Sequence, residues 1–143
     1  MHEIKRPTMP TKKMLFMGLH RPNRSPSQRF RFEQFQSFLE QNGYKIDYFY
    51  LINASDDQKF YAAGHYLAKV FILLKSIIKL FWISFRAGRF QLVFVQREAF
   101  MLGTVFFERQ IARKTKMVFD FDDSIWLQNV SKANQSLSFL KDA

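Results

Sequence analysis

The chain has 143 residues, of which 48% are hydrophobic and 24% charged, a composition typical of one globular domain and not of a disordered chain. It contains no cysteine, which excludes a disulfide framework and thiolate metal sites. The net charge is +10, and residues 1–31 hold eight Lys and Arg against one Glu, so the excess lies near the N-terminus and suggests an anionic partner.

Apolar runs and helical periodicities alternate along the chain. Strands are predicted at residues 13–19, 44–52, 90–96 and 116–121, and helices at residues 28–41, 60–85 and 99–115. Strands that are apolar almost throughout, alternating with helices, are typical of a parallel sheet covered on both faces. We therefore predict an α/β fold with a Rossmann-like domain at residues 13–127. A basic flexible N-terminus at 1–12 precedes it, and a C-terminal segment at 128–143, the truncated start of a further element, follows it.

The loop after the first strand, "HRPNRSPSQRFR", is rich in arginine and serine. Guanidinium groups near the start of a helix are well suited to bind an anion. No G-x-G-x-x-G or Walker pattern is present, so a standard dinucleotide or P-loop site is not indicated. Ser27, Arg29 and Arg31 are candidate anion-binding residues, and an exposed helix face is the alternative for the two arginines. In the first helix, Phe32, Phe35, Phe38 and Leu39 recur at helical spacing and predict an apolar face.

A polar loop, "NASDDQK", is predicted before the long helix at 60–85. Lysines interrupt this helix, so no apolar run reaches the length of about 18 residues expected of a membrane-spanning segment. One interpretation is a helix packed on the sheet with a single basic stripe exposed. The other is a peripheral contact with an anionic membrane through Lys75, Lys79 and Trp82. No secretory signal is visible in the polar N-terminus, so we expect a cytoplasmic protein.

The stretch "MVFDFDDSIW" places Asp120, Asp122 and Asp123 directly after the fourth predicted strand. In parallel sheets, binding groups lie at the carboxyl ends of the strands. The stretch fits the haloacid-dehalogenase pattern D-x-D-x-[ST]-[LI], in which Asp120 would be the nucleophile, Asp122 the acid and base, and magnesium would offset their charge. In that family, however, the motif closes the first strand. Here it closes the fourth, and no downstream lysine and acidic pair follows.

Three segments together resemble the N-terminal half of bacterial family-4 glycosyltransferases with the GT-B fold. They are the "SxxRFR" run after the first strand, "VFVQRE" at the end of the third and "FDFDDSIW" at the end of the fourth. The resemblance covers residues 13–127. It implies the acceptor-binding half of an enzyme that transfers a sugar from a nucleotide-sugar to a lipid-linked or polysaccharide acceptor. It implies no metal or other cofactor beyond the donor substrate.

The resemblance also assigns residues. Gly18 and the first loop would approach the donor diphosphate, Arg29 and Arg31 would contact phosphate or acceptor, and Arg97 and Glu98 would line the cleft. Asp122 or Asp123 would orient the acceptor hydroxyl, although many relatives carry a histidine-containing motif there. The family's donor-binding C-terminal domain is not in this sequence, so we expect a fragment that is inactive alone.

The rival from another functional class is a non-catalytic basic module that binds anionic lipid or nucleic acid, suggested by the charge and the aromatic content. The sequence shows no RNP-type aromatic strand motif, so nothing specific favours nucleic acid.

Overall fold

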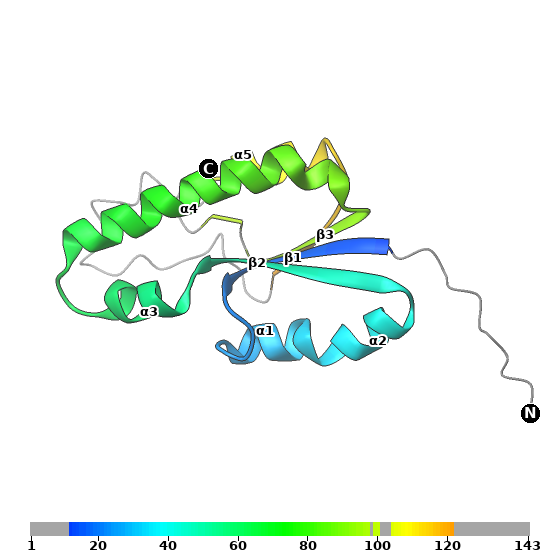
Figure 1. Cartoon of the computed structure of the whole chain (residues 1–143), viewed down its shortest axis with the longest axis horizontal. Helices are drawn as coiled ribbons and strands as arrows, with labels where there is room; N and C mark the ends of the chain where they lie inside the picture. The colour runs from blue at the N-terminus through cyan, green and yellow to red at the C-terminus, as the bar shows by residue number, and fades with distance from the viewer. Residues whose placement is uncertain (1–11, 98, 101–103, 122–143) are drawn as a thin grey trace, which may run out of the picture.

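The computed structural model describes residues 12–97, 99–100 and 104–121. Within these ranges the chain is α/β, a parallel sheet with helices on both faces, as predicted (Figure 1). The strands are β1 (Lys12–His20), β2 (Tyr44–Ile52), β3 (Leu92–Gln96) and β4 (Lys116–Asp120). The helices are α1 (Pro26–Arg31), α2 (Gln36–Gln41), α3 (Ala54–Tyr61), α4 (Tyr66–Arg86) and α5 (Phe106–Ala112), with short 3-10 turns η1 (Glu33–Phe35) and η2 (Ala87–Arg89).

The strand order in the sheet is β2-β1-β3-β4, and every neighbouring pair is parallel. The chain steps to one side from β1 to β2, and then crosses back to place β3 on the other side of β1. The direction of the connections therefore reverses between β1 and β3. In open parallel sheets this switch point leaves room at the carboxyl ends of the two strands, where ligands bind.

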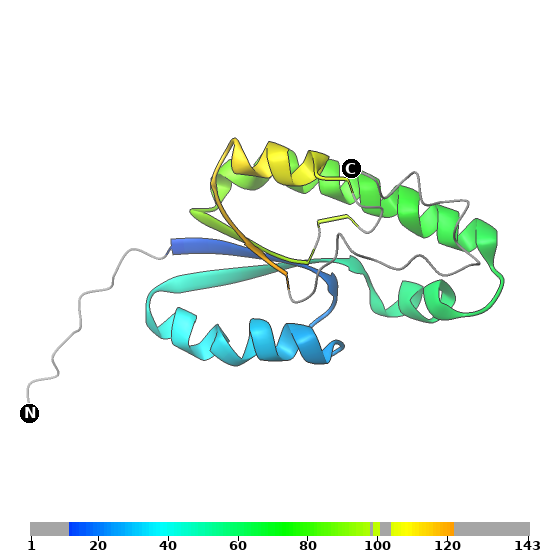
Figure 2. The ribbon, with the colours of Figure 1, turned by 180° about the vertical axis from the view of Figure 1, so that it is seen from behind.

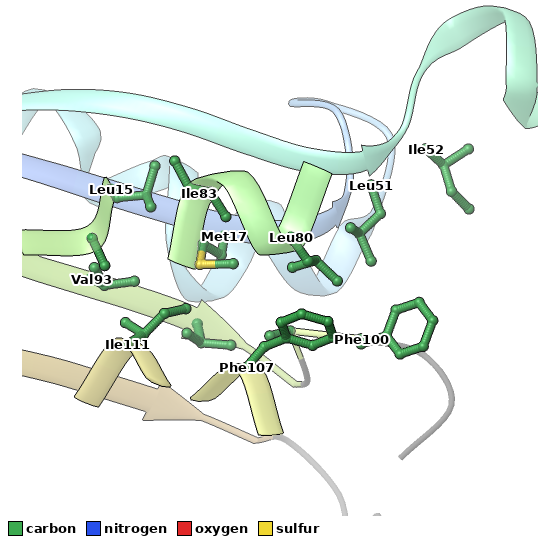
Figure 3. Packing of buried hydrophobic residues seen from close by; sticks show 13 residues of the cluster. Leu15, Met17, Leu51, Ile52, Leu80, Ile83, Val93, Phe100, Phe107 and Ile111 are labelled. Carbon is green, nitrogen blue, oxygen red and sulfur yellow. The ribbon is translucent and has the colours of Figure 1, made fainter. Parts of the chain in front are cut away.

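The larger part of the core lies between the sheet and the α4–α5 layer. Because side chains alternate along a strand, Leu15, Met17, Val93 and Val95 point to the same face. Figure 3 shows side chains from α4 and α5 packed against this face of the sheet. The fully or nearly fully buried residues of these helices in that cluster are Leu80, Ile83, Phe107 and Ile111.

The opposite face is covered by α1, η1 and α2, which Figure 2 shows on the other side of the sheet from α4 and α5. Its buried cluster consists of Met14, Phe16 and Phe32. The rings of Phe16 and Phe32 stack with centroids 4.1 Å apart. Phe32, the residue directly before η1, thus holds the α1–α2 layer against β1.

The helix predicted at 28–41 is interrupted. The 3-10 turn η1 separates α1 from α2 and changes the helical phase, so the predicted apolar face is only partly formed. Phe32 is buried and Leu39 packs against its cluster, whereas the exposed fractions of Phe35 and Phe38 are 50% and 64%.

The segment predicted as a polar loop before the long helix is itself helical, so that prediction was wrong. The side chain of Asn53 caps α3 by accepting a hydrogen bond of 2.8 Å from the N–H of Asp56. The predicted helix at 60–85 is correspondingly two helices. They are separated at Gly64 and His65, which both adopt left-handed backbone conformations with φ of 75° and 54°.

The helix predicted at 99–115 is shorter than expected. Ala99 and Phe100 follow β3 and are buried, but they are not helical, and α5 begins only at Phe106. The N–H of Ala99 donates a 2.8 Å hydrogen bond to Glu108 Oε1, and burial raises the pKa of that carboxyl group. This contact fixes the chain after β3 against the start of α5.

Candidate functional site

The carboxyl ends of β1, β3 and β4 meet helix α1 at one edge of the sheet. Alternation along the strands places Gly18, Gln96 and Asp120 on the face that α1 covers. Each of them meets a residue of α1, so this edge is built by contacts between segments far apart in the sequence.

Asp120, at the end of β4, forms a two-pronged ion pair with Arg31 at the end of α1. Arg31 Nε donates to Oδ2 at 2.6 Å and Arg31 Nη2 donates to Oδ1 at 2.5 Å. The same Nη2 also donates to the carbonyl oxygen of Phe121 at 3.2 Å. Both carboxylate oxygens are therefore engaged by one guanidinium, which neutralises the carboxylate at the strand end.

Gly18 and Gln28 make the closest approach between β1 and α1. A Cβ atom at Gly18 would lie 2.9 Å from Gln28 Oε1 and 2.9 Å from the Phe16 ring, so only glycine fits without a shift of these neighbours. Gln28 is buried and its Nε2 donates to Glu33 Oε1 at 2.7 Å. Next to it, Gln96 Nε2 donates to Ser27 Oγ at 3.2 Å, which ties α1 to β3.

The arginines of the first loop are held by helix α3. Arg24 Nε donates to Asp57 Oδ2 at 2.8 Å and Arg21 Nη1 donates to the same oxygen at 3.2 Å. The hydrogen bond from Arg24 holds the pKa of the Asp57 carboxyl below its usual range, against the opposing effect of burial. One carboxylate thus offsets part of the positive charge of these two arginines.

His20, the last residue of β1, lies near the Arg21–Arg24–Asp57 cluster. Its Nε2 is 3.2 Å from Tyr61 Oη of α3. Burial lowers the pKa of His20 below 6.5, and the charges of Arg24, Arg21 and Arg97 act in the same direction, while Asp57 opposes them. The imidazole is therefore neutral at pH 7, and a neutral imidazole can accept a proton.

A pocket of about 240 Å³ opens at the switch point between β1 and β3. Its lining combines the ends of both strands with the first loop and α1: Leu19, His20, Ser25, Gln28, Leu51, Gln96 and Arg97. Arg97 has a left-handed backbone with φ of 68°, and its N–H donates a 2.6 Å hydrogen bond to the carbonyl oxygen of Asp120. Left-handed conformations of residues other than glycine are concentrated at functional sites.

Several of the residues predicted from the sequence come together at this edge. Gly18 packs against Gln28, Ser27 accepts a hydrogen bond from Gln96, and Arg31 pairs with Asp120. Arg97 lines the pocket. Arg29 is exposed and its guanidinium carbon lies 5.9 Å from the ring of Phe30, so it does not share these contacts. Glu98, Asp122 and Asp123 lie outside the described residues.

The pocket also contains His20, Gln28 and Gln96, which the sequence analysis did not assign as site residues. Two of them could have been found. His20 and Gln96 are each the last residue of a predicted or observed strand, and strand ends meet at the switch point. Gln28 carries no such signal, because its burial depends on how α1 packs.

The three residues predicted to contact a membrane all lie on α4. Lys75 Nζ donates to Asp56 Oδ2 at 2.9 Å, while burial and the charge of Lys75 lower the pKa of Lys79. Trp82 is 55% exposed, with the guanidinium carbon of Arg86 3.9 Å from its ring centroid. Among the helices that the structure describes, none is long and apolar enough to cross a membrane.

Comparisons of the chain with protein-family models, with curated proteins and with solved structures gave no match. The site must therefore be interpreted from its own geometry.

Proposed function

We propose that this chain is the acceptor-binding half of a glycosyltransferase that transfers a sugar from a nucleotide-sugar to a lipid-linked or polysaccharide acceptor. The proposal includes a cytoplasmic location at the periphery of a membrane. The observation that carries it is the polar pocket at the switch point, where His20 and Arg97 meet hydrogen-bonding side chains of α1 and β3. The sequence resemblance described above supplies the reaction class.

Sugar transfer to a hydroxyl group has simple chemical requirements. The acceptor oxygen forms a bond to the anomeric carbon, the bond from that carbon to the donor phosphate breaks, and the nucleoside diphosphate leaves with the bonding electrons. The proton of the acceptor hydroxyl must pass to a base. His20 suits this step because its lowered pKa keeps the imidazole neutral at pH 7.

Arg97 and the amide groups of the pocket suit the other requirement, binding of an anionic or hydroxyl-rich substrate. A guanidinium stabilises phosphate oxygens by charge and by paired hydrogen bonds. Gln96 Nε2 and Gln28 Nε2 each already donate one hydrogen bond, to Ser27 and Glu33, and a side-chain amide has a second N–H and a carbonyl oxygen for sugar hydroxyls. The donor-binding half of such an enzyme would come from another domain, as the resemblance implies.

The test is a transfer assay with the complete gene product. Radiolabelled UDP- and GDP-sugars are incubated with membrane lipid extract and with polysaccharide precursors, and incorporation is measured in the wild type and in His20→Gln and Arg97→Gln. Incorporation should fall roughly a hundredfold or more in His20→Gln, since loss of a general base typically costs that much. Phe38→Gln, an exposed change on α2 remote from the pocket, is the matched control.

Absence of incorporation from every donor would overturn the proposal, and so would transfer that is unchanged in both pocket variants. The phosphatase alternative makes a separate prediction. It requires Asp120 as a nucleophile and therefore magnesium-dependent phosphate release that Asp120→Asn abolishes. Because both oxygens of Asp120 accept hydrogen bonds from Arg31, we expect no such release from common phosphoesters.

A further inference from the structure

The outward face of α4, opposite the sheet, is apolar along the whole helix. Its buried residues, such as Ile72, Ser76 and Leu80, define the side that packs on the core. The residues on the opposite side are all large and hydrophobic: Leu67, Val70, Phe71, Leu74, Ile78, Phe81, Trp82 and Phe85. Their exposed fractions run from 42% for Phe81 to 89% for Leu67.

This apolar face continues onto α5. The ring centroids of Phe81 and Phe106 are 5.9 Å apart, and Phe106 and Val105 are themselves 45% and 43% exposed. A 21-residue helix is about 30 Å long, so the exposed surface is a strip of that length. Apolar patches larger than a few hundred Å² are rare on monomeric proteins unless they bind something.

Cations border the strip on both sides. Lys75, Lys79 and Arg86 recur on one flank of α4, at spacings of four and seven residues. On the other flank lie two exposed arginines, Arg109 in α5 and Arg113 directly after it. Lys114 follows α5 and places its Nζ 4.8 Å from the ring centroid of Phe85.

One acidic side chain of the described residues, Asp56 of α3, reaches the basic flank of this surface, where it accepts a 2.9 Å hydrogen bond from Lys75 Nζ. Helix α4 contains no Asp or Glu, and Glu108, the acidic residue of α5, is buried against Ala99. Lys79, Arg86 and Arg109 form no ion pair with a described residue, whereas Arg21 and Arg24 of the first loop are paired with Asp57. Apart from the ion pair of Lys75 with Asp56, the charges that border the strip in the described part of the chain are therefore positive.

This charge pattern disfavours a second copy of the chain as the occupant. Packing two such strips together would bring the basic flanks of both copies close, with Asp56, already paired with Lys75, as the described acidic residue available to offset the repulsion. An anionic bilayer suits both the apolar strip and its cationic flanks, since it accepts apolar side chains at its acyl boundary and cations at its headgroups.

We propose that α4 and the adjoining start of α5 form a membrane-docking surface that lies flat on an anionic bilayer. The apolar strip enters the boundary between headgroups and acyl chains, and the flanking lysines and arginines contact lipid phosphates. Aromatic side chains such as Trp82 sit at the headgroup level, as amphipathic rings do. The inference rests on the surface alone and does not depend on sugar transfer.

The experiment measures vesicle binding of the complete chain. Flotation with vesicles of phosphatidylcholine is compared with flotation on vesicles of phosphatidylcholine mixed with phosphatidylglycerol, at low and high salt. Binding should require the anionic lipid and weaken as salt rises, because salt screens exposed charges. In a Trp126→Phe background, the emission of Trp82 should shift to the blue and be quenched by brominated lipid.

Two matched double variants test whether vesicle binding depends on this strip or on exposed hydrophobic side chains in general. Phe71→Gln with Ile78→Gln changes two side chains of the strip, each 69% exposed. Phe30→Gln with Phe38→Gln changes two side chains of the opposite layer, 63% and 64% exposed. The first pair should lower the partition coefficient by roughly tenfold or more, while the second leaves it unchanged. Thermal unfolding of both variants checks that the fold is intact.

Equal loss in both pairs, or binding that ignores lipid charge, would overturn the proposal. It would also be overturned if the protein floats with neither vesicle. Concentration-dependent dimerisation in sedimentation, abolished by Phe71→Gln with Ile78→Gln, would instead assign the strip to a second copy. None of these readouts involves sugar transfer, so a negative result would remove the peripheral membrane location from the proposed function and would leave the transfer reaction to its own assay.

Discussion

The two helical layers that cover the sheet differ in what they turn toward its edge and toward solvent. The α1–α2 layer buries a small aromatic cluster and directs Ser27, Gln28 and Arg31 to the strand ends. The α4–α5 layer buries most of the core and turns an apolar strip outward. Binding chemistry is therefore concentrated on one layer, and the other combines stability with a surface that is unusually apolar for a helix facing solvent.

Within helix α4, substitutions of buried and of exposed side chains should differ in their effect on the free energy of unfolding. Leu80 and Leu67 both belong to α4, with exposed fractions of 0% and 89%. Leu80→Ala should lower the free energy of unfolding by about 3 kcal/mol, because it removes packing and leaves a cavity. Leu67→Ala should change it by less than about 0.5 kcal/mol. Urea unfolding followed by circular dichroism measures both, and similar values for the two variants would contradict the assignment of the core face.

The α1 layer is tested at its closest contact with the sheet. Gly18→Ala should destabilise the protein by about 1–2 kcal/mol, because the new Cβ would lie 2.9 Å from Gln28 Oε1. In a Gln28→Ala background the same change should cost less, since the contact with Gln28 is gone, although the 2.9 Å approach to the Phe16 ring remains. A double-mutant cycle by urea unfolding gives the coupling, and additive effects would show that Gly18 and Gln28 do not constrain each other.

The smallest predicted effect on the free energy of unfolding is that of His20, which lies where the first loop and α3 meet. Its pKa is lowered in the folded protein, so the neutral form is favoured by folding. The stability that it contributes is complete above pH 6.5, the ordinary value, and is lost as the pH falls through the folded-state pKa. His20→Gln should flatten this part of the pH dependence of unfolding.

An NMR titration of the His20 ring measures the same pKa directly. Asp57 is the neighbour that raises the pKa of His20, so Asp57→Asn should lower it further. A pKa of His20 at or above 6.5 in the wild type would contradict the described burial and would weaken its assignment as a base.

The strands were the most predictable elements. Each observed strand lies within two residues of its predicted limits, because an apolar run bounded by polar residues is a local signal. The helices were less predictable. Asn53 with Asp56 and Asp57 in the next turn is a capping signal for α3 that the sequence analysis took for a loop. The break at η1 leaves Phe35 and Phe38 exposed, although their spacing predicted an apolar face.

The candidate site could be predicted in part. Parallel strands bring their carboxyl ends to one edge, and the ion pair of Arg31 with Asp120 lies at that edge. The pairing of Arg21 and Arg24 with Asp57 was not predictable, because it depends on α3, a helix that the sequence analysis did not find.

The sequence by itself determined the α/β class, the positions of the four strands along the chain and the aspartate at the end of the fourth strand. These features depend on periodicity and on residues close together along the chain. Only the tertiary structure decided which charges neutralise each other and which apolar side chains remain exposed. Arg31 and Asp120 are 89 positions apart, and the apolar strip of α4 is defined only by which side of the helix the sheet covers. Such choices depend on long-range packing, which no local pattern specifies.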